Sequence, residues 1–288
     1  MSQQSLPNFD SLWDYSNPDQ TEIKFREILL QIPENDPAYL ELLTQIARTQ
    51  GLQGKFDEAR QTLDQVEKAL DENPSRAKVR FLLERGRVFN SSGHADEARP
   101  LFEQASDLAK HLREDFYAVD AIHMLAIISP PESSLTLNLQ AIQLAESSGQ
   151  ERARNWLGSL YNNMGWSYHD MGDYESALEI FEKAESFRRS KGSAREIRIA
   201  TWCIARTLRS LNRIEEALSK QMTLKAEFES AGGTDGYVFE EIGECLLALN
   251  REDEARPYFA KAYEILSQGE FLVEQEPDRI ARLKKLGN

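Results

Sequence analysis

Small residues recur about every 39 positions along this chain, and this spacing limits its fold more than any other feature. The series is Ala47, Gly86, Ala126, Gly165, Ala205 and Gly243. Where two helix backbones pack at close range, a larger side chain has no room, so such positions need Gly or Ala. Their regular recurrence predicts a stack of similar helical units, which is a helical solenoid.

Two further series complete the repeating unit. Seven residues after each small position comes a residue that is Gly or Asn in five of six cases, and both types tolerate the left-handed conformation at a helix end. This series is Gly54, Gly93, Ser133, Gly172, Asn212 and Asn250. We expect the first helix of each unit to end there and a second, amphipathic helix to follow. The small positions of the second helices are Ala59, Ala98, Asn138, Ala177, Ala217 and Ala255.

Larger apolar residues recur at helical spacing around the small positions, which predicts that they form the core. On the first helices they are Leu43, Leu82, Ile122, Tyr161 and Phe239. On the second helices they are Leu63, Phe102, Ile142, Phe181 and Phe259. The repeating unit is therefore predicted to be an antiparallel pair of helices with a continuous core between neighbouring units.

These offsets resemble the tetratricopeptide repeat, which places an aromatic residue or Leu, then Leu-Gly, then Tyr on helix A, and Ala, Phe and Ala on helix B. The best copy is Tyr161, Met164, Gly165, Tyr168, Gly172, Tyr174, Ala177, Phe181 and Ala184. Six copies run in phase from about residue 40 to 268. The period exceeds the usual 34 residues, and Asn138, Thr201 and Gln221 depart from the consensus. The resemblance implies an all-α fold, a right-handed α-solenoid of antiparallel helix pairs forming a TPR-like superhelix.

We expect one solenoid domain over residues 19–270, because the phase of the repeat is unbroken. Upstream, Thr21, Phe25, Ile28 and Pro33 fall where the second helix of a preceding half repeat would place them. Residues 1–18 are predicted to form an N-terminal arm or cap. Residues 271–288 are predicted to contain a capping helix that opens at Pro277, since terminal repeats need a polar outer face.

The charge balance disfavours some classes of partner. The 288 residues include 34 Lys and Arg against 48 Asp and Glu, a formal net charge of −14. Nucleic acids and anionic membranes repel such a body. No apolar run approaches the roughly 18 residues of a membrane span. We expect a cytoplasmic protein, and Cys203 and Cys245, which lack metal-ligand or redox spacing, agree with a reducing compartment.

No motif supports catalysis, a cofactor or a metal. The four histidines lack the paired helical spacing of zinc ligands, and no Gly-x-Ser-x-Gly elbow occurs. The glycine-rich string at residues 231–236 lacks the features of a phosphate loop, so we expect a turn between repeats. We therefore expect no enzyme activity, no cofactor and no metal, although a site assembled from distant residues leaves no local motif.

The resemblance also implies where a ligand binds, because tetratricopeptide arrays line their inner, concave surface mainly with helix A. The matching positions include Arg48, Arg80, Arg87, His123, Asn162, Trp166, His169, Trp202, Arg206 and Arg209. Arginine forks pair with carboxylates at two points and tryptophan faces offer stacking area, so this composition suits an acidic or aromatic peptide. The alternative is that these arginines pair with acidic neighbours and that the two tryptophans pack between repeats.

The first sixteen residues form an arm rich in Ser, Asn and Pro that also carries Phe9, Leu12, Trp13 and Tyr15. One interpretation is that the arm caps the first helices. The other is that it folds into the groove as a built-in competitor of a partner. Deletion of residues 2–16 would lower stability in the first case and raise affinity for a partner in the second.

The function that these patterns indicate is a non-enzymatic protein–protein interaction module. It would act as an adaptor or scaffold that holds a peptide segment or a partner protein on its concave face. The alternatives are a nucleic-acid-binding helical repeat and an enzyme with an unrecognised site, and self-association stays open. A receptor for chaperone tails is disfavoured, because Asn163 matches one residue of that subfamily but the accompanying Lys and Asn are missing.

Overall fold

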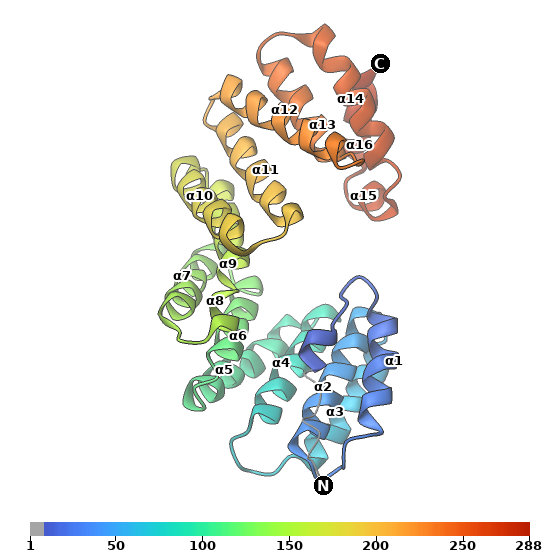
Figure 1. Cartoon of the computed structure of the whole chain (residues 1–288), viewed down its shortest axis with the longest axis vertical. Coiled ribbons are helices and arrows are strands. Elements are labelled where there is room, and N and C mark those ends of the chain that lie inside the picture. The colour runs from blue at the N-terminus through green and yellow to red at the C-terminus, as the bar shows by residue number, and fades with distance from the viewer. Residues whose placement is uncertain (1–8) are drawn as a thin grey trace. The chain divides into compact units, whose positions relative to one another are not determined.

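The computed structural model describes residues 9–288, and the remaining part of the predicted N-terminal arm, residues 1–8, lies outside the described residues. Within the described residues the chain is helical and contains no strand. It divides into two compact units, residues 1–157 and 158–288. Successive helices pack as antiparallel neighbours within each unit (Figure 1), which confirms the predicted fold class. The single solenoid domain over residues 19–270 stays a prediction.

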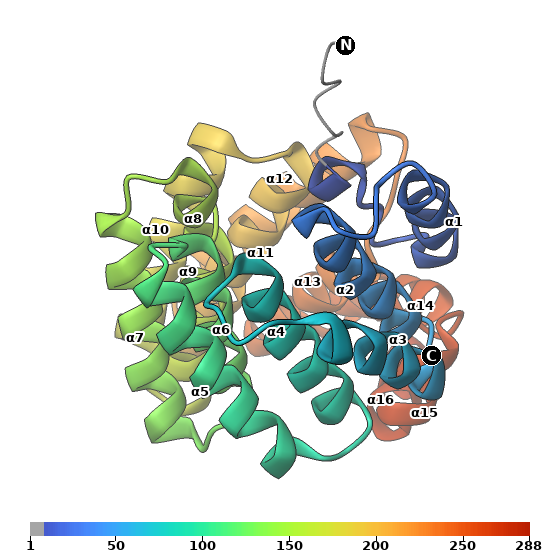
Figure 2. The ribbon, with the colours of Figure 1, turned by 90° about the horizontal axis from the view of Figure 1, so that it is seen from below.

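The first unit opens with a short 3₁₀ helix, η1 (Phe9–Leu12), and with α1 (Pro18–Leu29), which contains Thr21 and Phe25 of the predicted half repeat. Three helix pairs follow in the described chain. They are α2 (Pro37–Leu52) with α3 (Phe56–Ala69), α4 (Arg76–Ser91) with α5 (Ala95–His111), and α6 (Asp115–Ile127) with α7 (Pro131–Ser147). The first helices α2 and α4 lie side by side (Figure 2), and the short α8 (Glu151–Arg154) packs against α6 and α7.

The second unit repeats the same arrangement. Its pairs are α9 (Leu157–Asp170) with α10 (Tyr174–Lys191), α11 (Ala194–Ser210) with α12 (Ile214–Ser230), and α13 (Gly236–Ala248) with α14 (Glu252–Leu266). The short α15 (Glu270–Gln275) leads to α16 (Pro277–Gly287), which packs against α14. The first N–H group of a helix has no partner within the helix, so proline, which lacks this group, suits the first position. α16 begins at Pro277, as the sequence indicates.

The turns between the paired helices follow the predicted series with one exception. The backbone φ is +74° at Gly54, +86° at Gly93, +80° at Gly172, +59° at Asn212 and +58° at Asn250. Ser133 was expected to end the third first helix, and this is wrong, because α6 ends at Ile127 and Ser133 lies in the first turn of α7. The cause is Pro131, whose fixed φ suits the first position of a helix and starts α7 early.

The small residues of the first helices lie under large side chains of the second helices. A Cβ added at Gly86, Gly165 or Gly243 would meet the ring of a phenylalanine sixteen residues later at 2.5, 2.5 and 2.9 Å. These rings belong to Phe102, Phe181 and Phe259. Where the small residue is Ala instead, the residue sixteen positions later is Leu63, Ile142 or Gln221. Glycine is therefore kept where the partner is a ring, because the two side chains share one packing volume.

Gln221 is fully buried at a position where the other repeats carry an apolar residue, and its amide oxygen and nitrogen have no partner among the described residues. Because a buried amide without hydrogen bonds costs about 1–3 kcal/mol, Gln221→Leu should raise the free energy of unfolding by about that amount. Chemical denaturation measures it. Gln65→Leu, at an exposed position on α3, is the control and should change stability by less than about 0.5 kcal/mol. An equal or lower stability for Gln221→Leu would contradict this account.

Candidate functional site

The predicted ligand-binding arginines of the first unit are engaged in ion pairs with acidic side chains. Arg87 contacts Glu84 at 2.7 Å and Asp120 at 2.5 Å, and Arg48 contacts Glu84 at 3.2 Å. The side chains of Glu84 and Asp120 are only 5% and 8% exposed. Although burial opposes the charge of Arg87, its two acidic neighbours raise its pKa above the ordinary value. These contacts agree with the alternative interpretation, in which the arginines of the inner row pair with acidic neighbours.

Arg80 lies deeper than the other predicted site residues of this unit. Its residue is 3% exposed, and its guanidinium contacts the carboxylates of Asp10 at 2.6 Å and Glu41 at 3.1 Å. His123 packs its ring against Trp156 with a centroid separation of 5.2 Å. Burial lowers the pKa of His123, and the opposing effect of Asp120 does not outweigh it. His123 is therefore neutral at pH 7.

In the second unit, the first helices carry a row of aromatic side chains. Trp166 on α9 lies 6.0 Å from Trp202 on α11, and Trp202 lies 6.3 Å from Tyr237 on α13, measured between ring centroids. Trp166 also contacts the ring of Phe181 at 5.2 Å. The row is half-buried, and Tyr237 is 40% exposed. The tryptophans therefore pack between repeats and also contribute to the surface of the first helices.

An apolar pocket of about 240 Å³ opens beside this row. Its lining comes from α11, from the end of α12 and from the start of α13. The lining residues are Arg198, Ile199, Trp202, Phe228, Asp235, Tyr237 and Val238. The guanidinium of Arg198 lies 4.5 Å from the centre of the Phe228 ring, and within residues 9–288 it pairs with no carboxylate. The volume is below the roughly 300–1,000 Å³ of small-molecule sites, so the pocket suits one large side chain.

A second pocket, of about 180 Å³ and more polar, adjoins the first at Ile199. Its polar lining residues are Ser159, Asn162, Asn163, Arg188 and Glu196. Ile199 lines both pockets and is 46% exposed, so it forms the rim between them. The side-chain amides of Asn162 and Asn163 can donate and accept hydrogen bonds, as the backbone of an extended peptide requires.

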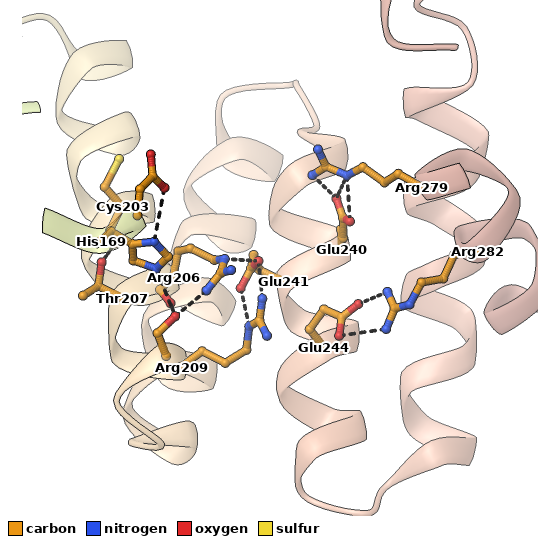
Figure 3. A network of polar contacts seen from close by, with 12 residues as sticks. His169, Cys203, Arg206, Thr207, Arg209, Glu240, Glu241, Glu244, Arg279 and Arg282 are labelled. Atoms are coloured by element: carbon orange, nitrogen blue, oxygen red, sulfur yellow. Dashed lines mark hydrogen bonds and ion pairs between the residues drawn. The ribbon is translucent and has the colours of Figure 1, made fainter. Parts of the chain in front are cut away.

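Arginines and glutamates of α11, α13 and α16 form the network in Figure 3. Arg206 and Arg209 share one carboxylate, that of Glu241, at 3.2 and 2.8 Å. Burial and the neighbouring charge of Arg209 lower the pKa of Arg206 despite Glu241. Although burial opposes it, the hydrogen bonds to Glu241 raise the pKa of Arg209. The positive charge of Arg206 is therefore the less well compensated of the two.

The other glutamates of this network have their own partners. Arg279 of α16 contacts Glu240 at 2.6 Å, and Arg282 of α16 pairs with Glu244. His169 contacts the hydroxyl of Ser210 through Nε2 at 3.0 Å. Burial and Arg206 lower the pKa of His169, so its ring is neutral at pH 7. The ligand-binding role of the residues expected from the sequence stays a prediction.

Sequence reasoning missed several residues of the two pockets. Arg198 and Ile199 lie one turn before Trp202 on α11, so extending the helical period backwards from Trp202 could have found them. Phe228 lies at the end of a second helix, and Arg188 lies on another second helix. No signal in the sequence relates these two residues to the first-helix positions.

The described residues show no metal site and no reactive thiol. No cluster of three or more potential ligands gathers within residues 9–288. Cys203 and Cys245 are buried, and burial raises the pKa of each thiol to about 12.

The glycine-rich string at residues 231–236 joins α12 to α13, where Asp235 caps α13, as expected of a turn. No helix in the described part of the chain is long and apolar enough to cross a membrane.

Comparison with known proteins identifies the repeat. The tetratricopeptide repeat family matches residues 44–111, 158–191 and 238–265. The apo form of RapI has a similar structure, with 14% identity and a TM-score of 0.75 over 98% of this chain and 84% of its own. The apo quorum sensor NprR from B. thuringiensis shows 14% identity and a TM-score of 0.67 over 98% of this chain and 79% of its own.

A third similar structure is a Signal Transduction ATPase with Numerous Domains that has a tetratricopeptide repeat sensor, from Pyrococcus horikoshii. It shows 15% identity and a TM-score of 0.70 over 94% of this chain and 42% of its own. A search of curated proteins finds no match to the sequence. At these identities the likeness to solved structures shows a shared fold.

Proposed function

We propose that this chain, which belongs to the tetratricopeptide repeat family, is a non-enzymatic adaptor or scaffold that binds a peptide segment of a partner protein. Repeats of this family form protein-interaction modules, and we place the binding site on the first helices of the second unit. The observation that supports this site is the pair of adjoining pockets, one apolar and one polar, on the two sides of the exposed Ile199. The buried, free thiols agree with action in the reducing cytoplasm.

The two pockets define the chemistry of the segment. A large apolar side chain would fill the apolar pocket and stack on Trp202 and Tyr237, which supply most of the binding energy in such sites. The amides of Asn162 and Asn163 would hold the adjoining backbone. Arg198 and Arg206 lie two turns apart on the same face of α11 as Trp202, so a carboxylate next to the apolar side chain would meet a guanidinium.

Selection from a peptide-display library, followed by fluorescence polarisation with the selected peptides, tests this function. We expect the chain to enrich peptides with a large apolar residue beside an acidic one. Ile199→Glu places a charge on the rim of both pockets and should weaken binding at least about tenfold, an effect typical of a central contact residue. Because Ile199 is half exposed, the variant should keep its melting temperature.

Ile127→Glu is the matched control, because Ile127 is also exposed (54%), lies on a first helix of the first unit and lines neither pocket. This variant should bind the selected peptides as the wild type does. If no peptide is enriched, or if a folded Ile199→Glu variant binds like the wild type, the proposed site is wrong.

A further inference from the structure

Residues 9–15, here called the arm segment, lie on the first helices of the first unit. The carboxylate of Asp10 accepts two hydrogen bonds from the guanidinium of Arg80, at 3.0 and 2.6 Å, and contacts Arg152 at 2.9 Å. Burial opposes the ionisation of Asp10, but the hydrogen bonds and charges of the two arginines outweigh it and hold its pKa below the ordinary value. One carboxylate is thus held in a two-point geometry by α4 and, at the same time, by α8.

The aromatic residues of the arm segment make further contacts with α2 and α4. The Phe9 ring lies 5.1 Å from the guanidinium carbon of Arg80. The indole Nε1 of Trp13 donates to the Oε1 of Gln45 at 3.1 Å, and the guanidinium of Arg48 lies 5.8 Å from the indole ring. Tyr15 stacks on Trp13 with a centroid separation of 4.8 Å.

Two of the contacted residues, Arg48 and Arg80, are helix-A positions that the family resemblance assigns to a ligand. Gln45 and Arg48 lie on α2, and Arg80 lies on α4. The segment that occupies them is acidic and aromatic, which is the ligand chemistry expected from the inner row. It belongs to no helix pair, and it also packs on α1, where the rings of Phe9 and Trp13 lie 6.5 and 5.3 Å from the ring of Phe25.

The charges beneath the arm segment require an anion. Glu41 contacts both Arg76 at 2.9 Å and Arg80 at 3.1 Å, and Arg76 also contacts Glu114 at 3.7 Å. Arg152 adds a third cation at the same place. Without Asp10, the surface would hold a buried guanidinium that is incompletely compensated, which is costly. Any segment that covers this surface must therefore bring a carboxylate to the position of Asp10.

We propose that this surface of α2, α4 and α8 is a recognition site for acidic aromatic segments of a partner, and that the arm segment is its resident occupant. The partner's segment carries an aromatic residue directly before an Asp and a Trp three residues after that Asp, as in Phe9, Asp10 and Trp13. A short tether keeps the arm segment at an effective concentration of about 1 mM, so it competes with every such partner. This site is separate from the pockets of the proposed function.

The probe for this proposal is a fluorescein-labelled synthetic peptide with the sequence of residues 9–17, added to the full-length chain. Asp10→Ala/Trp13→Ala in the chain removes the contacts with Arg80, Arg152 and Gln45, which should release the arm segment, and it leaves the residues of the surface unchanged. We expect this variant to bind the peptide at least about tenfold more tightly than the wild type, whose own segment blocks the site. A peptide with the same two substitutions is the control and should not bind. Addition of Arg152→Ala to the released chain should weaken binding of the unchanged peptide.

Equal binding by the released and wild-type chains would overturn the proposal. A variant that is still folded at the assay temperature, melts well below the wild type and binds no peptide would also overturn it, because the segment would then be a fixed part of the fold. The single variant Asp10→Ala, measured in the same way, covers the case in which the double variant fails to fold. Ile199→Glu in the released chain separates this site from the pockets of the second unit, since a loss of peptide binding there would place the peptide in the second unit.

Discussion

Gly165→Ala should lower the free energy of unfolding by about 2 kcal/mol. The added Cβ would lie 2.5, 2.7 and 2.8 Å from three atoms of the Phe181 ring. That ring is fully buried and packs against Trp166, so a shift of the ring would disturb the surrounding core. Overpacking of this severity costs about 3 kcal/mol, and the better helix propensity of Ala offsets about 1 kcal/mol. Urea denaturation followed by circular dichroism measures the difference.

A second substitution at the ring should rescue the first. The chain combines Ala with Leu at the equivalent positions Ala47 and Leu63, so Gly165→Ala/Phe181→Leu restores a combination of volumes that a repeat already uses. The double variant should therefore be more stable than the sum of the two single effects predicts. Gly149→Ala, where an added Cβ meets no atom within 4 Å, is the control and should be nearly neutral. If the effects of Gly165→Ala and Phe181→Leu on the free energy of unfolding are additive, the two residues do not share one packing volume.

Arg87→Glu should lower the free energy of unfolding by about 4 kcal/mol, because it breaks a buried ion pair and leaves its partners uncompensated. Arg87 contacts both Glu84 and Asp120, so the change would place three carboxylates together. The side chains of Glu84 and Asp120 are only 5% and 8% exposed, so water would screen their repulsion poorly. Thermal denaturation should show a much lower melting temperature. Loss of ligand binding by this variant would therefore reflect unfolding, and binding is better tested at exposed positions such as Ile199.

Arg213→Glu is the matched control for this charge reversal. Arg213 is 46% exposed and pairs with the exposed Glu216 at the start of α12. Water screens such an exposed pair and it contributes little to stability, so this variant should melt close to the wild type. Similar melting temperatures for the two variants would show that the ion pairs of Arg87 contribute no more than a surface pair.

The helix pairs and their core were predictable because the relevant information is local and repeated six times. In each copy a small residue is followed by a turn residue seven positions later and by a small residue on the next helix. Because the offsets are the same in all copies, a copy with an atypical residue can still be aligned with the others. Ser133 shows the limit of this reasoning. The ring of proline fixes its backbone φ at a value that suits the first position of a helix. Pro131 therefore starts α7 two residues before Ser133, where the repeat pattern predicts the turn.

The sequence by itself determined the antiparallel helix pairs and the recurring buried positions, because these follow from helical period and side-chain volume. Only the tertiary structure decided what the arginines contact. The partner of Arg48 is 36 residues away, that of Arg209 is 32 residues away, and Asp10 reaches Arg80 across 70 residues. A change of a few ångströms makes or breaks an ion pair, so the rotation of each helix against the next sets which charges are compensated and which surfaces stay open to a ligand.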